Sequence, residues 1–230
     1  MALVNSYIFR GDATDKSGSA NGTLAGTTTP ANQEGYLAGT SSYYFTSSGT
    51  GDLSRCDFAR TTFQYTGATP FSWEMWFKSS KADATLHSLM ICRDSGVSYF
   101  TGAIALYISD TEVLQLYMGG GGAGNLDFTG TTNVCDGLWH HVVLVYDGSD
   151  DIVMYLDGNV EGTKSATVTL GSSDLYTANS KFSIAAAYYH LTTNYYYGLT
   201  GNIGYFGNWN EALTARAVKD LFMRGKKRTY

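Results

Sequence analysis

The sequence GLWHHVVLVYDGSDDIVMYLDGN, residues 137–159, decides the fold of this chain. Residues 139–146 alternate between two sets of bulky, mostly apolar side chains, as a strand with one set on each face requires. Because both sets are apolar, we expect both faces of this strand to be covered. A loop of Asp, Gly and Ser leads to a second predicted strand, residues 152–156. Asp157-Gly158 then predicts a tight turn with positive φ. The stretch therefore predicts a β-meander in the middle of a β domain.

The composition indicates one large domain with an unusually neutral surface. The chain has 230 residues, of which 43% are hydrophobic and 14% aromatic, enough for a sizeable core. Only 15% are charged, against about 25% in average domains. Surface polarity must then come from Gly, Ser, Thr and Asn, which suits many short strands joined by neutral loops. The net charge of -5 argues against nucleic acid as a partner.

The cysteines and the first ten residues indicate in which cellular compartment the chain is expected to be made. Cys56, Cys92 and Cys135 form an odd set without metal-like spacing, so we expect buried free thiols; one disulfide with a thiol left over is the alternative. The first ten residues carry no basic segment followed by an apolar run, so no signal peptide is predicted. No stretch has the length of a membrane span, and no membrane partner is expected.

Strand patterns recur along the rest of the chain. The clearest is residues 71–78, where aromatic and apolar side chains alternate with mixed ones. The single predicted helix starts at the N-cap Thr214 and ends near Gly225, its expected stop signal. We predict an all-β, antiparallel β-sandwich, residues 1–225, with a short C-terminal helix and a basic tail, residues 226–230. Further predicted strands cover residues 4–9, 43–45, 88–93, 103–108, 113–118, 166–170 and 182–187.

The order of short motifs resembles a known family. Trp139-His140-His141-Val142, Tyr146-Asp147-Gly148 and Tyr155-Leu156-Asp157-Gly158 follow the W-x-H-V, D-G and Y-x-D-G pattern of laminin-G-like and pentraxin-like domains. These domains are part of the concanavalin-A-like lectin/glucanase superfamily. The strand at 71–78, the segment 199–213 and the final helix also resemble that family, so the likeness covers nearly the whole chain. It implies a jelly-roll fold.

The resemblance also implies a cation site in the loop after the first strand. Some relatives bind calcium there through carboxylates, and the matching residues are Asp12 and Asp15, with Asn21 as a further oxygen donor. Calcium needs six to eight oxygens, and two carboxylates do not suffice. The alternative is a loop held by Asx hydrogen bonds. Gly204 stands where relatives carry an Asp that can complete the site, which weakens the calcium expectation.

A catalytic role is not supported by the sequence. Glycanases of this superfold carry paired carboxylates on one strand, whereas the neighbours of Glu74 at the second and fourth positions are Trp76 and Lys78. His140 and His141 fall on opposite faces of one strand, so they cannot share a site. We therefore expect no enzyme activity and no cofactor apart from the calcium considered above.

A tyrosine-rich segment is the main candidate for ligand binding. Five tyrosines and a histidine fall within residues 188–197. Tyrosine combines a flat apolar face with a hydroxyl, which suits sugar stacking and interfaces. The alternative is that alternate tyrosines lie in the core. The candidate ligand-binding residues are Tyr188, Tyr189, His190, Tyr195, Tyr196 and Tyr197.

Together these features favour a non-catalytic binding protein. The expected role is a bacteriophage virion component, a capsid decoration, fibre or tail protein, that displays a lectin-like domain. Its expected location is the virion, after synthesis in the host cytoplasm without a signal peptide. Expected partners are other virion proteins or host-surface glycans, in a homo-oligomer or symmetric array. A free carbohydrate-binding lectin module is the alternative, and a glycan-cleaving enzyme is a third.

Overall fold

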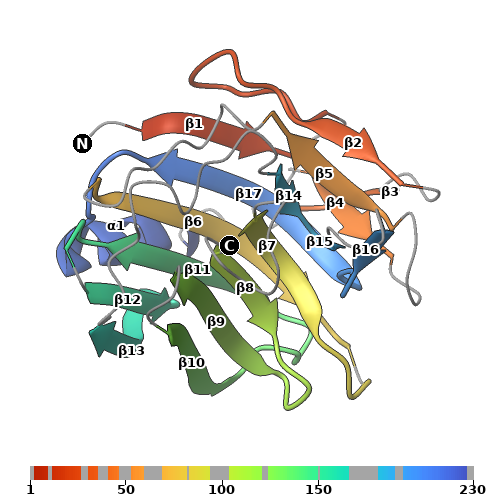
Figure 1. The fold of residues 1–230 in the computed structure, drawn as a ribbon. Helices are drawn as coiled ribbons and strands as arrows, with labels where there is room; N and C mark the ends of the chain where they lie inside the picture. Colours follow the sequence, from red (N-terminus) through yellow and green to blue (C-terminus); the bar gives the residue numbers. More distant parts are fainter. Residues whose placement is uncertain are drawn as a thin grey trace.

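The computed structural model places two antiparallel sheets face to face, with one helix on the outside (Figure 1). It describes residues 3–9, 12–26, 31–35, 41–46, 53–59, 69–81, 83–93, 104–120, 124–149, 151–165, 181–189 and 194–226. The predicted all-β sandwich with a short C-terminal helix is confirmed. The predicted strand at 166–170 and the tail after residue 226 lie outside the described residues.

The first sheet has eight strands and is built around β6 and β11. Its order is β13-β12-β11-β6-β17-β4-β3, and β1 also pairs with β17. The meander predicted from residues 137–159 forms β11, β12 and the start of β13. Its strands are β1 (Leu3–Ile8), β3 (Ala31–Glu34), β4 (Ser41–Phe45), β6 (Phe71–Ser79), β11 (Trp139–Tyr146), β12 (Asp151–Leu156), β13 (Asn159–Ser165) and β17 (Gly201–Trp209).

The second sheet has seven strands in the order β10-β9-β8-β7-β14-β5-β2. A separate two-stranded hairpin, β15 and β16, lies beside β14 and β7. The strands of this sheet and the hairpin are β2 (Thr23–Ala25), β5 (Arg55–Phe58), β7 (His87–Arg93), β8 (Ile104–Ile108), β9 (Val113–Gly120), β10 (Gly124–Asn133), β14 (Lys181–Ile184), β15 (Ala187–Tyr189) and β16 (Asn194–Tyr196).

The main core fills the space between the sheets. Along β11, Val142, Leu144 and Tyr146 point into it, while Val143 and Val145 belong to a second apolar cluster on the outer face. This confirms that β11 is covered on both sides. All three cysteines are free; Cys56 and Cys92 are buried, and Cys135 is half-buried.

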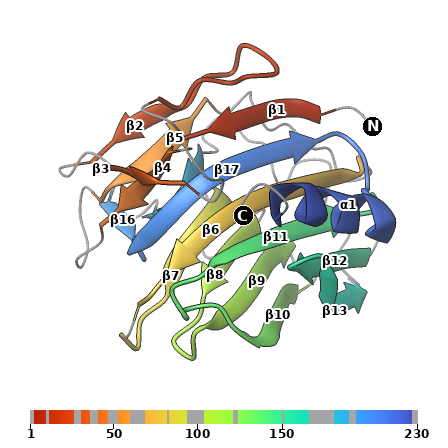
Figure 2. The ribbon, with the colours of Figure 1, turned by 180° about the vertical axis from the view of Figure 1, so that it is seen from behind.

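Helix α1 (Ala215–Lys226) covers the outer face of the eight-stranded sheet (Figure 2). It begins as predicted, since the Thr214 hydroxyl accepts a hydrogen bond from the Ala217 amide at 3.2 Å. The predicted stop at Gly225 is wrong, because the helix continues through it to Lys226. A Cβ at Gly225 would lie 2.3 Å from the ring of Trp76, so this glycine permits close packing rather than ending the helix. None of the described helical residues forms a segment long and apolar enough to cross a bilayer.

The turn after β12 has the predicted geometry. Asp157 and Gly158 both have positive φ, 51° and 74°, as a primed two-residue turn requires. On the same flank, β10 and β13, the edge strands of the two sheets, come together. The Glu161 carboxylate accepts hydrogen bonds from the amides of Thr131 and Thr132 at 2.6 and 2.8 Å. Phe128 packs against Gly162 so closely that no Cβ would fit there.

Candidate ligand-binding site

The tyrosine-rich segment forms the β15–β16 hairpin at one end of the seven-stranded sheet. Tyr188 is opposite Tyr195 in its register, and Tyr189 is opposite Asn194. The side chains of Tyr188, Tyr189 and Tyr195 lie outside what the structure describes, as does all of His190. The hairpin adjoins β7, so it borders the outer face of this sheet.

Tyr197, just after the hairpin, is the described tyrosine of this segment with the most exposed side chain. It is 43% exposed, whereas Tyr196 is half-buried. The Tyr197 ring meets that of Tyr107 edge-on, with centroids 5.9 Å apart, and that of Tyr196 at 6.3 Å. Its backbone φ is +53°, uncommon for a bulky side chain and frequent at functional positions. The Ser88 amide donates to the Tyr197 carbonyl at 2.5 Å and fixes the segment against β7.

A row of polar and aromatic residues extends from Tyr197 across the outer face of the sheet. Ser88 is opposite Tyr107, Tyr107 is opposite Gln115, and Gln115 is opposite Thr129. The row runs from buried to open: Ser88 and Tyr107 are buried, Gln115 is half-buried and Thr129 is exposed. The Ser88 hydroxyl is buried without a hydrogen-bond partner among the described residues. This arrangement offers aromatic faces beside amide and hydroxyl groups.

Sequence reasoning missed this row. Its members lie on four strands, and their meeting depends on strand order and register. A weak signal existed in the strands at 103–108 and 113–118, where Tyr107 and Gln115 interrupt the apolar alternation on the outward positions.

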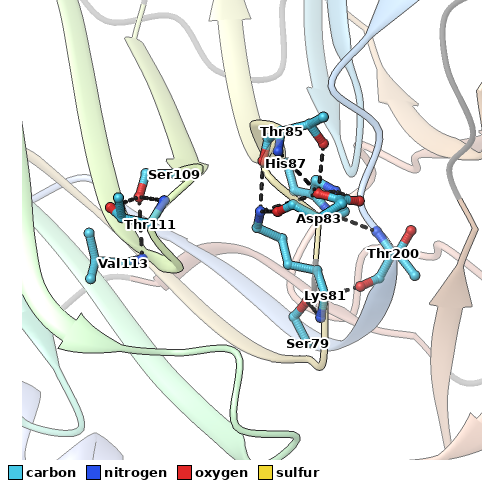
Figure 3. A network of polar contacts seen from close by, with 9 residues as sticks. All are labelled: Ser79, Lys81, Asp83, Thr85, His87, Ser109, Thr111, Val113 and Thr200. Atoms are coloured by element: carbon cyan, nitrogen blue, oxygen red, sulfur yellow. Dashed lines mark hydrogen bonds and ion pairs between the residues drawn. The ribbon is translucent and has the colours of Figure 1, made fainter.

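The loop between β6 and β7 contains a compact polar network that reaches Thr200, three residues after Tyr197 (Figure 3). Lys81, whose side chain is fully buried, donates to the carbonyls of Asp83 and Thr85 at 2.8 and 2.7 Å. The Asp83 carboxylate lies 3.1 Å from His87 Nε2. On the other side of the ring, the Thr200 amide donates to His87 Nδ1 at 3.2 Å. Ser79 donates to the Thr200 carbonyl at 3.0 Å, so both backbone groups of Thr200 are held.

These contacts fix the tautomer of His87. Because Nδ1 accepts the Thr200 amide hydrogen, it carries a lone pair, and the ring proton is on Nε2, facing Asp83. Burial is the main reason why the pKa of His87 lies below its ordinary value; Asp83 opposes this effect and Lys81 adds to it. Burial alone would raise the pKa of Asp83, but hydrogen bonds from Thr85 and the proximity of His87 bring it to about 2.

The residues predicted to bind calcium are engaged in hydrogen bonds within their loop and with β1. The Asp15 carboxylate is buried and accepts four of them, and these outweigh burial and lower its pKa. Asn21 Oδ1 accepts from the Asp15 amide at 3.0 Å. Asp12 is more exposed and contacts the Thr14 amide and the Lys16 ammonium at 3.0 and 3.2 Å. In the described ranges no three His, Cys, Asp or Glu side chains gather as a metal site would require. The donors to Asp15 are Asn5, Ser6, Ser17 and Ala20.

Glu74 and the paired histidines lie away from this row. Glu74 is buried under α1, where its oxygens contact His141 Nε2 at 3.1 Å and the Trp209 indole N–H at 3.2 Å. His140 points to the opposite side of β11, toward Phe77, as predicted from the alternation. Its two nitrogens contact Asp157 at 2.9 Å and Asp136 at 3.1 Å. Among the described residues, Glu74 therefore has a histidine and a tryptophan as partners rather than a second carboxylate.

Three solved structures with a similar fold are two toxin binding domains and one domain of an arabinanase. The binding domain of Paraclostridial Mosquitocidal Protein 1 matches 96% of this chain at 16% identity with a TM-score of 0.72. The binding domain of botulinum neurotoxin DC, solved with rat synaptotagmin II, matches 97% of this chain at 12% identity with a TM-score of 0.69. The chain spans 51% of each of these two. Domain 4 of an extracellular arabinanase from Geobacillus stearothermophilus, solved with arabinotriose, matches 95% of this chain over 97% of its own length, at 17% identity and 0.67.

At such identities these likenesses establish the fold alone. No protein of curated function matches the sequence significantly. A family model described as the concanavalin A-like lectin/glucanases superfamily matches residues 50–219, which include the central meander and the start of α1. The two facing antiparallel sheets and the ordered motifs on β11 and β12 agree with that match. The chain belongs to the concanavalin A-like lectin/glucanases superfamily.

Proposed function

We propose that this domain binds carbohydrate without cleaving it, on the outer face of its seven-stranded sheet beside Tyr197. The observation that carries the proposal is the exposed ring of Tyr197, which packs edge-on against Tyr107. The backbone of Tyr197 has the left-handed conformation. A tyrosine face stacks on the apolar face of a sugar ring, and its hydroxyl reaches sugar hydroxyls. Gln115 and Thr129 supply amide and hydroxyl groups in the same row. The arabinanase domain solved with arabinotriose supports this ligand class.

A glycan array tests the proposal. The wild-type protein should give signal for a defined set of oligosaccharides, and Tyr197→Ala should reduce it at least about tenfold, because a stacking contact of this kind contributes on the order of 1–2 kcal/mol. Gln115→Ala should reduce it less. Met223→Ala is the control, since Met223 is similarly exposed, at 39%, but lies on α1. Full glycan signal in Tyr197→Ala would contradict the proposed site.

The absence of cleavage is part of the same proposal. Acid–base glycoside hydrolysis needs two carboxylates flanking the scissile bond, and Glu74 is buried with His141 and Trp209 as its contacts. Incubation with the polysaccharides that bind on the array should release no reducing sugar. Release that disappears in Glu74→Gln would overturn this part.

We also propose that a bacteriophage virion carries the domain, as a capsid decoration, fibre or tail component. The low charge content and the Gly-, Thr-, Ser- and Tyr-rich composition support a domain displayed in a symmetric assembly. An antibody against the domain should detect it in density-purified particles, at a copy number that matches a symmetric position. Detection in the soluble fraction alone would count against a virion location.

A further inference from the structure

His87 connects the polar network between β6 and β7 to the segment that carries Tyr197. The Thr200 amide, three residues after Tyr197, donates to His87 Nδ1, and this bond spans 113 positions of sequence. The next residue, Ser88, donates its backbone amide hydrogen to the Tyr197 carbonyl. The start of β7 is thus bonded to both ends of the segment 197–200. The His87 side chain is 3% exposed, so its protonation state cannot be changed without consequence for these contacts.

We propose that His87 is an acid-sensitive latch: neutral, it holds the Thr200 end of the segment 197–200 in the ligand-binding arrangement, and protonated, it releases that end. In the neutral ring, Nδ1 accepts the Thr200 amide hydrogen. In the imidazolium, Nδ1 carries a hydrogen and becomes a donor facing another donor at 3.2 Å. That contact turns from attractive to repulsive. The effect on ligand binding rests on the carbohydrate site proposed above; the release of the segment does not.

Burial of His87 places the transition below neutral pH, and the charges around the ring modify it. Asp83 faces Nε2 at 3.1 Å and favours the imidazolium, while the buried ammonium of Lys81, held by Asp83 and Thr85, disfavours it. Across the ring, the Thr200 amide faces Nδ1, and the segment 197–200 contains no charged residue. Burial has the largest effect, Lys81 adds to it, and together they keep the pKa of His87 below about 6.5, the ordinary value, against the opposing effect of Asp83. The latch stays closed at neutral pH and opens on acidification.

Release is local, because other bonds hold the neighbouring backbone. The Leu199 amide donates to the Ala185 carbonyl at 2.7 Å, and the Ser88 amide still holds Tyr197. These bonds involve no titrating group in the range of histidine. We expect Thr200 to gain freedom, while Tyr197 keeps its backbone bond to Ser88 and the sheets stay intact.

The first test needs no ligand. In uniformly labelled full-length protein, the Thr200 amide chemical shift and its hydrogen-exchange rate are followed by NMR between pH 7.5 and 4.5. In the wild type, both should change with one midpoint below 6.5, and exchange, corrected for intrinsic pH dependence, should accelerate about tenfold. In His87→Asn, whose side-chain oxygen can accept the same amide hydrogen but does not titrate, neither should change. A Thr200 amide that ignores pH in the wild type would overturn the latch.

Asp83→Asn gives a second, conservative variant. It removes the negative charge that favours the imidazolium, so the midpoint should move to lower pH while the Thr200 bond at neutral pH is kept. A midpoint that moves upward or stays in place would also contradict the mechanism. The amide spectrum at pH 7.5 verifies the fold of each variant.

The second test measures binding of the oligosaccharide that gives the strongest array signal at pH 7.5. The wild type should bind it about tenfold more weakly at pH 5.0, as expected for one reversed hydrogen bond, and His87→Asn should bind it equally at both values. Equal acid weakening in His87→Asn would overturn the link to binding. If no glycan binds at any pH, the carbohydrate proposal fails, and the Thr200 measurement still decides the latch.

Discussion

The pKa values of two buried histidines, His87 and His140, are shifted in opposite directions, although both side chains contact carboxylates. His87 has one nitrogen facing an amide donor, so only the neutral ring satisfies its partners. His140 has both nitrogens facing carboxylates, of Asp157 and Asp136, so the charged ring satisfies them better. Burial disfavours the charge of His140, but the hydrogen bonds and charges of these two carboxylates outweigh it and raise its pKa. The hydrogen-bond partners thus decide whether the pKa of a buried histidine is raised or lowered.

His140→Gln tests this difference through the pH dependence of stability. A histidine whose folded-state pKa is raised contributes stability that is complete below the unfolded value of about 6.5 and is lost as pH rises through the folded value. We expect the variant to lose about 2 kcal/mol of unfolding free energy at pH 5.5 and clearly less at pH 9. Urea unfolding at both values measures it. A loss that does not vary with pH would show that His140 acts only by packing.

Asp15 gives the second prediction at this scale. Asp15→Ala removes a buried carboxylate that accepts four hydrogen bonds and should cost about 3 kcal/mol. Because hydrogen bonds lower the pKa of Asp15 against the effect of burial, this contribution is present above about pH 4 and is lost as pH falls through the folded-state value. Asp12→Ala, at an exposed position, should cost less than about 0.5 kcal/mol. Denaturation with and without added calcium measures both; calcium stabilisation of the wild type that either variant abolishes would support the calcium site.

Among the elements, α1 depends on close contact with the sheet beneath it. The Phe222 ring stacks on Trp76 with centroids 5.9 Å apart and lies 6.0 Å from His141. Gly225 approaches the same tryptophan. The helix therefore caps the buried Glu74–His141 pair, which would otherwise face water. Its last turn is fixed by packing on Trp76.

Gly225→Ala separates this packing role from a stop signal. In an exposed helix interior, this change would stabilise by about 1 kcal/mol through helix propensity. Here the added methyl would meet Trp76, and we expect a loss of about 2 kcal/mol, from overpacking, in thermal or urea unfolding. Arg224→Ala is the control on the exposed side of the same turn, and its stability should match that of the wild type. A Gly225→Ala variant more stable than the wild type would contradict the packing role.

The elements themselves were predictable because their signals are local. Alternation over 71–78 and 139–146, the Asp157-Gly158 turn and the Thr214 cap each depend on neighbouring residues. The contact of Tyr107 with Tyr197 depends on how β7, β8 and the hairpin meet, and the same is true of the His87–Thr200 bond. Gly225 failed as a stop because its constraint comes from Trp76, distant in sequence. Local sequence patterns therefore predict the strands, whereas the candidate site depends on contacts between residues that are distant in sequence.

At the scale of the whole molecule, the two outer faces differ in what they carry. The eight-stranded sheet bears α1 (Figure 2), and the seven-stranded sheet bears the row beside Tyr197. Between them, the core encloses two thiols, of Cys56 and Cys92. Burial raises the pKa of Cys92 to about 12 and raises that of Cys56 as well. These thiols become reactive only when the sandwich opens.

Thiol labelling with a chromogenic disulfide therefore reports opening of the sandwich. At pH 8 the native protein should react slowly and only at Cys135, which is half-buried, and all three cysteines should react in denaturant. The labelling rate of the two core thiols should follow the unfolding free energy across the variants above. Rapid modification of Cys56 or Cys92 in the native protein would contradict a closed core.

The junction of β10 and β13 has a consequence for how copies of the domain can associate. Unpaired amides on an edge strand invite a strand from another molecule and so begin aggregation. Glu161 already occupies the amides of Thr131 and Thr132, and Phe128 covers the backbone at Gly162. An incoming strand would have to expel a carboxylate before it gained its first bond. This flank is closed to polymerisation, and crowded copies can stand side by side there without fusing their sheets.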